Sequence, residues 1–443
     1  MPLSGLDIYK LLPKTNCKQC GFATCLAFAM QLAKKAVVIE KCPYLSTEAK
    51  KILEDSAQPP IKLVTIGIGE DKVEVGNESV VFRHEEKFHR PCAAGFIIND
   101  SLSDVEILNK VKEINNLKFE RVGQKLEVNI IAVKQCSDAT RFKDAVKLIS
   151  SNTRLNLVLM SEDLTALKEA TVFTKDRRPL IYNANKNNLS EAVKLAKEFN
   201  LPLVVKGADL NEISNLTKEL TGFGLSELIL DTGEKNIKDK LWDFTQIRRQ
   251  ALKKSNRLLG YPALAIVDKA DPYAEAVEAA TYIAKYAGII LLRNIHAWEV
   301  LALLTLRQNI YTDPQKPLQI EPKIYAVGQV NKKSPLLITT NFSLSYYTVL
   351  AEVEASKIPS YIMSVDTEGM SVLTAWAAEK FTPDKISDSI NKFGVSEVVS
   401  HKNLIIPGYV AVMSGDLEEH SGYKVIVGPK EAAGIPSFLK NLQ

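Results

Sequence analysis

The densest group of reactive side chains in this sequence is a set of four cysteines within the first 45 residues. Cys17, Cys20, Cys25 and Cys42 follow the spacing C-x2-C-x4-C-x16-C, and Pro43 comes directly after the last of them. Three closely spaced thiolates can hold one face of an iron–sulfur cubane, and bacterial ferredoxin runs also end in Cys-Pro. A structural zinc site usually pairs two C-x2-C turns, and the second turn is absent here. The spacing therefore favours a [4Fe–4S] cluster over a zinc ion or over unligated buried cysteines.

The fourth cysteine requires an element that carries the chain away from the first three and back. Residues 26–33 have apolar side chains at helical spacing, and Thr24 is a suitable N-cap for such a helix. The stretch between Cys25 and Cys42 is long enough for this helix and a return. We expect an apolar shell around the cluster, formed by Phe22, Ala23, Phe28 and Leu45.

The bulk composition limits the class of protein and its partners. A chain of 443 residues is too long for one ordinary core, so we expect two or three domains. Hydrophobic residues make up 46% and charged residues 24%, which is typical of a soluble globular protein. The formal net charge is +4 and no basic stripe is interleaved with aromatic residues, so we expect no nucleic-acid partner.

The sequence shows no pattern typical of a signal peptide or of a membrane-spanning segment. The N-terminus has no basic region followed by an apolar core and a cleavage site. The longest apolar run, near residues 287–292, is much shorter than the ~18–20 residues that cross a bilayer. We therefore expect a cytoplasmic protein without a membrane segment. In such a protein, six cysteines indicate metal or redox chemistry rather than disulfides.

The middle of the chain repeats a strand-then-helix pattern. A linker is expected at residues 56–60, followed by an antiparallel pair at 62–67 and 79–83. Buried strands alternating with amphipathic helices then predict a (β/α)8 TIM-like barrel. The eight strand-length apolar runs are 95–99, 128–133, 155–160, 179–182, 203–205, 227–230, 263–267 and 288–292.

Catalytic residues of such barrels lie just past the carboxyl ends of the strands. The residues at those positions are Asp100, Lys134, Ser161, Asn183, Lys206, Asp231, Asp268 and Arg293, and they form no paired-carboxylate or metal-ligand motif. Asp100, Asn183 and Asp231 could hydrogen-bond a pterin, as in barrel methyltransferases, but Asp and Asn also routinely cap such loops. We favour the capping role, and we assign no catalytic residue.

Three further residues near the barrel strands could also be read as functional. Cys92 and Cys136 flank predicted strands, and we expect them to be buried small residues rather than ligands. His296 opens the helix after the eighth strand beside Trp298, where we expect a packing or capping role.

A second α/β region follows a boundary at residues 311–317. Strands are predicted at 324–327, 336–339, 361–365, 409–413 and 425–427, with helices between them. This pattern predicts an open, doubly wound, Rossmann-like sheet, in which ligands bind outside the carboxyl ends of the strands.

Three loops at those ends could contact a ligand, namely residues 337–346, 366–374 and 428–435. Gly369 would let the backbone approach a ligand, and Ser371 could cap the helix that follows. None of the loops is G-x-G-x-x-G, so a dinucleotide site has little support. Loops rich in small residues suit a wide, flat cofactor with amide arms, such as a corrin, although they could also be ordinary βα loops.

The order of these parts resembles one known family. The C-x2-C-x4-C-x16-C-P segment, the barrel, and the loops Thr-Thr-Asn-Phe-Ser and Thr-Glu-Gly-Met-Ser-Val-Leu-Thr are similar to the large (gamma) subunit of the corrinoid iron–sulfur protein of the acetyl-CoA (Wood–Ljungdahl) pathway. The resemblance implies a [4Fe–4S] domain at 1–57, a TIM-like barrel at 58–315 and a corrinoid (cobamide)-binding domain at 316–443.

The resemblance also implies which residues hold each cofactor. Cys17, Cys20, Cys25 and Cys42 would bind the cluster. Thr374 would approach the cobalt face of the cobamide, and the residues lining the corrin would be Thr340, Tyr346, Met370, Ser371, Val372, Leu373, Ala433 and Gly434.

The function implied by the resemblance is that of a methyl-carrier subunit rather than a free-standing enzyme. The corrinoid cobalt would accept a methyl group from methyl-tetrahydrofolate through a separate methyltransferase and pass it to acetyl-CoA synthase. The cluster would return Co(II) to Co(I). The implied partners are a small subunit that completes a heterodimer, the methyltransferase, acetyl-CoA synthase, and a reductive activator or ferredoxin.

The histidines indicate how the cobalt is held. Many cobalamin domains supply an axial histidine from a D-x-H-x-x-G turn, but none of the five histidines here lies in one, and His420 only comes near. The sequence therefore favours a cobamide without a protein histidine ligand. Two other functions stay open at this point: a pterin-dependent corrinoid methyltransferase acting through its own barrel, and an electron-transfer subunit whose C-terminal sheet binds flavin.

Overall fold

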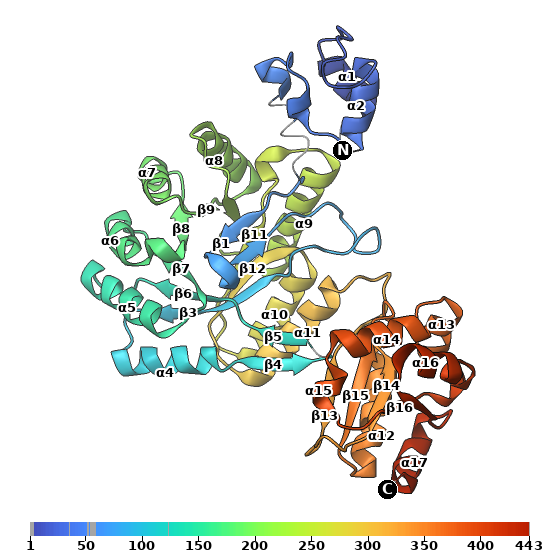
Figure 1. The fold of residues 1–443 in the computed structure, drawn as a ribbon. Helices are drawn as coiled ribbons and strands as arrows, with labels where there is room; N and C mark the ends of the chain where they lie inside the picture. The colour runs from blue at the N-terminus through green and yellow to red at the C-terminus, as the bar shows by residue number, and fades with distance from the viewer. Residues whose placement is uncertain (1–3, 35, 51–52, 54–58, 123, 443) are drawn as a thin grey trace. The chain divides into compact units, whose positions relative to one another are not determined.

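The computed structural model describes residues 4–34, 36–50, 53, 59–122 and 124–442 (Figure 1). The chain divides into two compact units, one formed by residues up to Lys118 with Glu127–Tyr311, the other by Phe119–Leu126 with the residues from Thr312 on. The predicted boundary at 57/58, and most of the predicted linker at 56–60, lie outside the described residues.

The cysteine-rich segment contains two short helices, α1 (Gly5–Leu11) and α2 (Cys25–Ala33). The Ser4 hydroxyl caps α1 through the Asp7 N–H, and the Asp7 carboxylate accepts from Ser4 in return. Thr24 caps α2 by accepting from the Ala27 N–H at 3.0 Å, as the sequence predicted. A turn of 3-10 helix at Ile39–Lys41 then leads into Cys42.

Eight parallel strands form a closed barrel, in the order β10-β11-β12-β3-β6-β7-β8-β9. This confirms all eight predicted runs. The strands are β3 (Ala93–Asn99), β6 (Ile130–Lys134), β7 (Asn156–Met160), β8 (Leu180–Ala184), β9 (Leu203–Lys206), β10 (Leu228–Asp231), β11 (Ala263–Val267) and β12 (Ala287–Leu292). Aliphatic side chains from these strands fill the interior, so the barrel is a packed core.

Helices form an outer ring around the barrel (Figure 1). They are α4 (Asp104–Asn115), α5 (Ala139–Asn152), α6 (Leu164–Thr174), α7 (Leu189–Phe199), α8 (Leu210–Gly222), α9 (Ile237–Lys253), α10 (Pro272–Ala284) and α11 (Ala297–Tyr311). Side-chain caps fix the starts of six of them, from Ser103, Asp138, Asp163, Asp209, Asn236 and Asp271. In the described part of the chain, no helix combines the length and apolar character needed to cross a membrane.

The segments around the barrel strands differ in part from the prediction. β1 (Val64–Ile66) pairs antiparallel with β2 (Val73–Val75), so the predicted partner at 79–83 is wrong. The buried carboxylate of Glu78 explains the difference, because it accepts from the N–H groups of His89 and Arg90 and draws the following residues into a loop. The two-stranded sheet of β4 (Lys118–Arg121) and β5 (Gln124–Glu127) was not predicted.

The second unit contains a five-stranded sheet in the order β13-β15-β14-β16-β17. Here β14 (Leu336–Thr340), β15 (Ser360–Val365), β16 (Asn403–Ile406) and β17 (Lys424–Val427) are parallel, and β13 (Ile324–Val327) runs antiparallel at one edge. One face packs on α12 (Ser343–Ser356) and α17 (Ile435–Asn441), and the other on α13 (Val372–Ala377), α14 (Pro383–Lys392), α15 (Val395–Val398) and α16 (Ser414–Ser421).

The predicted strand at 409–413 is wrong. The fourth strand of this unit in sequence order is Asn403–Ile406, and residues Gly408–Met413 form a 3-10 helix. Pro407 has no N–H to donate and ends the strand, and Val410 N–H then donates to its carbonyl. The apolar side chains Val410 and Met413 are buried against the sheet by this helix, so their burial, not a strand, explains the apolar run.

A buried carboxylate on α11 makes the stability of the barrel depend on pH. Glu299 is fully buried, and neither of its carboxylate oxygens has a hydrogen-bond partner among the described residues. Burial, with a smaller effect from the nearby Glu275 carboxylate, raises the pKa of Glu299 from 4.5 to about 7. The folded protein therefore keeps this proton at a pH where the unfolded chain releases it.

We predict that the free energy of unfolding falls as pH rises from about 4.5 to about 7, by a total on the order of 3 kcal/mol for this group. Glu299→Gln should remove that loss, because the amide does not ionise. Urea unfolding at about pH 5 and about pH 8 measures it. Glu191→Gln, an exposed position on α7, is the matched control. Equal pH dependence in Glu299→Gln and in the parent would contradict the prediction.

Candidate functional site

The four N-terminal cysteines lie on a loop and at the ends of two helical turns. Cys25 is buried at the start of α2, Cys20 and Cys42 are half-buried, and Cys17 is exposed. The Oδ1 atom of Asn16 accepts from the Cys25 N–H at 2.8 Å, which ties the loop to the helix. Asn16 has a φ of 50°, in the left-handed region that Asn tolerates better than most residues.

Cys25 belongs to a buried apolar cluster, and Cys20 and Cys42 pack against it. Burial raises the pKa of the Cys42 thiol, and Cys20, Cys25 and Cys17 act on it in the same direction by charge repulsion. All four are free thiols. Within the described ranges, no group of three or more His, Cys, Asp or Glu residues is arranged for a single metal ion.

An apolar cluster supports this region. Phe28 is almost fully buried, and its ring lies 5.8 Å from the ring of Phe22, centroid to centroid. Leu45, Cys20 and Cys42 pack against the same cluster. Of the predicted apolar shell, Ala23 is the exception, because it is exposed to solvent.

The polar residues at the barrel strand ends are largely occupied by other protein groups. The Asp100 carboxylate accepts from the N–H groups of Cys136 and Ser137 at 2.7 and 3.0 Å. Asn183 donates to Glu162 and accepts from Asn185. These contacts fix βα loops, which is the role we favoured from the sequence.

The other residues noted near the barrel are placed as follows. Cys92 is fully buried, as predicted, but Cys136, in the loop after β6, is exposed, so that expectation is wrong. The ring of His296 stacks on Trp298 at 6.2 Å between centroids, which agrees with a packing role.

The C-terminal sheet has a cavity of about 320 Å³ at the carboxyl ends of its parallel strands. The chain passes from β14 to β15 on one side and then crosses to β16 on the other, so the strand order reverses between β14 and β16. The cavity lies at this reversal, where open α/β sheets bind ligands. Its lining includes Thr339, Phe342, Ser345, Ser371, Val372, Ile406, Pro407, Tyr409, Gly428, Lys430 and Ala432.

The predicted corrin-lining residues are only partly gathered at this cavity. Ser371 and Val372 line it. Thr340 and Tyr346 are buried in the domain, and Leu373 is exposed. Of the remaining four, Met370 and Gly434 are half-buried, and Thr374 and Ala433 are exposed.

Two expectations about the Asp366–Thr374 loop need correction. Ser371 stands at the N-cap position of α13, but its hydroxyl contacts the Thr374 hydroxyl at 3.0 Å instead of capping the helix. Gly369 has a φ of 76°, and a Cβ there would lie 2.6 Å from Cγ of Gln319. Its role is therefore to allow the turn and its packing on Gln319, not to open the backbone to a ligand.

Asn341 positions this loop, and sequence reasoning missed its role. Its Oδ1 accepts from the N–H groups of Thr367 and Gly369 and from the Thr367 hydroxyl, at 2.9–3.0 Å. Its Nδ2 donates to Gln319 and Asp366. The signal in the sequence was an Asn directly after a buried strand, which is a common loop-fixing position. The contribution of Pro407 and Tyr409 was also missed, because that segment was predicted to be a strand.

Three buried hydroxyls at or near the strand ends lack hydrogen-bond partners in the part of the chain that the structure describes. They are Thr339 Oγ1, Thr340 Oγ1 and Ser364 Oγ. Buried polar groups are normally paired, so a set of unpaired hydroxyls is unusual. Thr339 lines the cavity, and a ligand with polar arms could engage its hydroxyl.

Comparison with known proteins defines the class. The family model "CO dehydrogenase/acetyl-CoA synthase delta subunit" matches residues 63–439, and the model "Putative Fe-S cluster" matches residues 12–44, which contain all four cysteines. Among solved structures, 7,8-dihydropteroate synthase from Vibrio fischeri ES114 is similar with a TM-score of 0.40 and 14% identity, covering 57% of this chain and 100% of that one.

Full-length relatives narrow the class further. The chain is 46% identical to the corrinoid/iron-sulfur protein large subunit of Moorella thermoacetica, over 99% of each chain. It is 37% identical to the acetyl-CoA decarbonylase/synthase complex subunit gamma of Methanothermobacter thermautotrophicus, over 100% of this chain and 99% of that one. The chain belongs to the family of large (gamma) subunits of corrinoid iron–sulfur proteins.

We predict that Asn341→Ala destabilises the C-terminal unit by about 3 kcal/mol or more, because it leaves buried N–H groups of the loop unpaired. Amide hydrogen exchange of Thr367 and Gly369 should accelerate in the same variant. Asn391→Ala, on the exposed side of α14, is the matched control and should change neither measurement. Unchanged exchange in Asn341→Ala would show that the loop is held by other contacts.

Proposed function

We propose that this chain is the methyl-carrier subunit of an acetyl-CoA pathway, with a [4Fe–4S] cluster at its N-terminus and a corrinoid in its C-terminal domain. The proposal rests on one observation: the same chain contains the four-cysteine segment and, in its C-terminal sheet, a cavity at the point where the strand order reverses. When bound, the corrinoid cobalt takes up and releases a methyl group, and the cluster supplies the electron that restores over-oxidised cobalt.

The N-terminal donor set fits an iron–sulfur cluster. Cys17, Cys20, Cys25 and Cys42 would be the four thiolate ligands, because all four lie in the segment that the Fe-S cluster model matches, and Cys20, Cys25 and Cys42 lie at one apolar cluster. The Cys25 N–H donates to Asn16 Oδ1, and this hydrogen bond fixes the loop that carries Cys17 and Cys20 to the start of the helix at Cys25.

The C-terminal cavity fits part of a corrinoid. Its wall is apolar, from residues such as Ile406 and Val372, and it includes the Thr339 hydroxyl that lacks a protein partner among the described residues. No side chain of the described residues caps α12, whose first residues also line the cavity. An apolar wall with a hydroxyl that has no protein partner among the described residues suits a macrocycle with amide arms.

The proposed cobamide takes no axial histidine from this chain. In the C-terminal unit, His401 contacts the Ser334 carbonyl oxygen at 2.9 Å and His420 approaches Asp384 at 3.4 Å. Neither residue is part of the cavity lining as far as it is described. A cobalt without a strong axial base is easier to reduce, which supports the proposed use of the cluster.

The proposal divides the chain into a cluster domain at 1–57, a barrel at 58–315 and a corrinoid domain at 316–443. The relatives are named as subunits of complexes, which supports a small-subunit partner for this chain. The other proposed partners are a methyl-tetrahydrofolate methyltransferase, acetyl-CoA synthase, and a reductive activator or ferredoxin. The alternative, a methyltransferase acting through its own barrel, is less well supported because Asp100, Asn183 and Asp231 already bond to protein groups.

We predict that Cys20→Ala abolishes the iron–sulfur absorbance while the corrinoid stays bound. Methyl transfer should start normally from pre-reduced cobalt and should fail to recover after an oxidation, because no cluster delivers the electron. Repeated assays with a controlled oxidation between them measure this, with Cys136→Ala, an exposed cysteine of the barrel, as the control. Recovery of Cys20→Ala at the parent rate with the same reductant would overturn the repair role.

We also predict that Val372→Trp prevents corrinoid binding, because the indole fills the cavity that Val372 lines. The corrin absorbance should disappear, while the iron content and the unfolding transition stay as in the parent. Val412→Trp, at a position that is 74% exposed, is the control. A corrinoid content equal to that of the parent in Val372→Trp would place the cofactor elsewhere.

A further inference from the structure

The barrel has its own cavity, to which the proposed carrier function assigns no ligand. Its volume is about 740 Å³, and it lies at the carboxyl ends of the strands, where barrels of this type bind ligands. The apolar part of its lining comes from Ile97, Met160 and Ile266, and Tyr182 contributes an aromatic ring. A cavity of this size can hold a small organic molecule.

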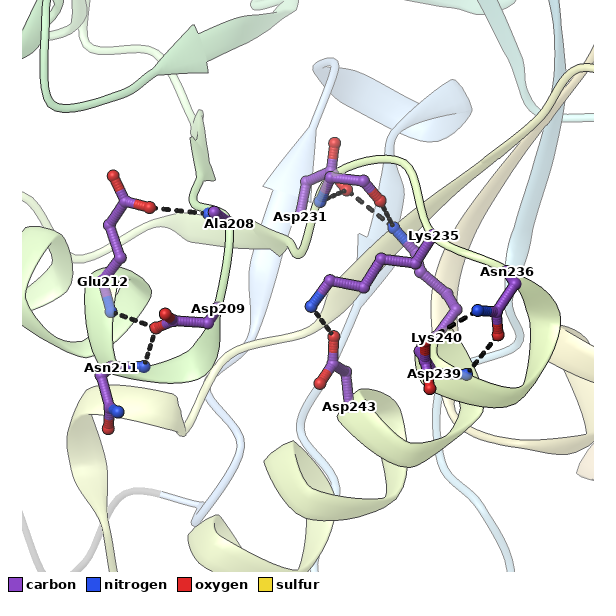
Figure 2. A network of polar contacts seen from close by, with 11 residues as sticks. Ala208, Asp209, Asn211, Glu212, Asp231, Lys235, Asn236, Asp239, Lys240 and Asp243 are labelled. Atoms are coloured by element: carbon purple, nitrogen blue, oxygen red, sulfur yellow. Dashed lines mark hydrogen bonds and ion pairs between the residues drawn. The ribbon is translucent and has the colours of Figure 1, made fainter.

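Tyr182, Asp231 and Lys240 in the lining of this cavity form a polar network, of which Figure 2 shows Asp231 and Lys240. The Asp231 carboxylate accepts from the Tyr182 hydroxyl at 2.8 Å, from Lys240 Nζ at 2.9 Å and from the Gly233 N–H at 3.0 Å. Lys240 also donates to the Gly233 carbonyl oxygen at 2.8 Å. Burial and the Asp231 charge raise the pKa of Tyr182, so its hydroxyl stays a donor. The Asp231 carboxylate is therefore occupied on both oxygens.

Beside this network lies a lysine, Lys206, that has no counter-charge among the residues that the structure describes. Lys206 at the end of β9 is the strand-register partner of Asp231 on β10, which would be its natural carboxylate. The ammonium group instead lies 5.6 Å above the ring of Tyr182, and among the described residues no carboxylate forms an ion pair with it. Lys206 is half-buried and lines the cavity, so its positive charge lies at the cavity wall without an ion-pair partner in the described ranges.

The other charges at the mouth are mostly paired. Lys269 bonds to Glu278 at 3.1 Å, Arg293 to Asp268 at 3.1 Å, and Lys235 to Asp243 at 2.5 Å (Figure 2 shows the last pair). The remaining charged lining residues, Lys134, Glu162 and Glu234, are exposed, where water solvates them. Among the charged lining residues, Lys206 thus combines two properties: its side chain is half-buried, and it has no ion-pair partner in the described ranges.

The geometry points to a binding site for a small organic anion in the barrel mouth, with the anionic group on Lys206 and an apolar body against Ile97, Met160 and Ile266. A half-buried charge is stabilised by a counter-charge. The Asp231 carboxylate, opposite Lys206 in the strand register, is already bonded to Tyr182 and Lys240, so a bound anion would supply the counter-charge for Lys206. The ligand class is a carboxylate or a phosphate monoester with a hydrocarbon or ring body. This site is separate from the proposed cofactors and does not depend on them.

Benzoate and phenyl phosphate are suitable probes, because they share a ring and differ in the anionic group. The whole complex, purified without oxygen, is treated with acetic anhydride, and acetylation of Lys206 is quantified by peptide mass spectrometry. At least one probe should protect Lys206 saturably, by about fivefold or more at concentrations up to about 20 mM, the range of fragment-sized ligands. Lys194, exposed on α7, serves as the internal reference and should not be protected.

Direct binding of the probe supplies the second readout. In ligand-observed NMR, Lys206→Met should weaken binding of the protecting probe by about tenfold or more, since a charge-assisted bond is lost. Lys194→Met is the matched control and should bind as the parent does. Benzyl alcohol, with the same ring and no charge, should bind about tenfold more weakly than the anion. The inference is overturned if neither anion protects Lys206, or if Lys206→Met binds the probe as tightly as the parent.

Discussion

Parallel strand pairing is the constraint on which both folded units depend. When adjacent strands run in the same direction, each connection must cross the sheet through a helix, and the carboxyl ends of all strands meet at one edge. In the barrel that edge carries the cavity beside Lys206, and in the C-terminal sheet it carries the cavity between β14 and β16. The same geometry thus creates two places for ligands, with different linings.

The two edges differ in the hydrogen-bond partners of the polar groups at their strand ends. In the barrel, the strand-end groups of Asp100, Asn183 and Asp231 are bonded to loops and neighbouring side chains, and a lysine is left with its charge. In the C-terminal sheet, Asn341 accepts hydrogen bonds from the loop N–H groups, and hydroxyls such as that of Thr339 have no partner in the described part of the chain. Because buried polar groups are costly when unpaired, these groups support the two proposals, an anion in the barrel cavity and a corrinoid in the cavity of the sheet.

Much of the architecture was predictable because it follows from local patterns. Each barrel strand is an apolar run of strand length, and the predicted cap at Thr24 depends on adjacent residues alone. The failures have non-local causes. The run at 409–413 has the composition of a strand, but Pro407 and the packing of Val410 and Met413 make it helical. The predicted pairing with 79–83 failed because the buried Glu78 carboxylate, which accepts from the His89 and Arg90 N–H groups and pairs with the distant Arg248 at 2.9 Å, holds that segment in a loop. Which loop residues line a cavity also depends on tertiary packing, as the buried Tyr346 and the lining residue Tyr409 illustrate.

We propose that this one chain holds both an iron–sulfur cluster and a cobalt cofactor. Metal analysis of the protein purified without oxygen tests it most directly. We predict about four iron atoms and about one cobalt atom per chain, and we expect a variant without the N-terminal cysteines to lose the iron. One zinc atom per chain without iron, or iron without cobalt in a preparation that was supplied with corrinoid, would contradict it.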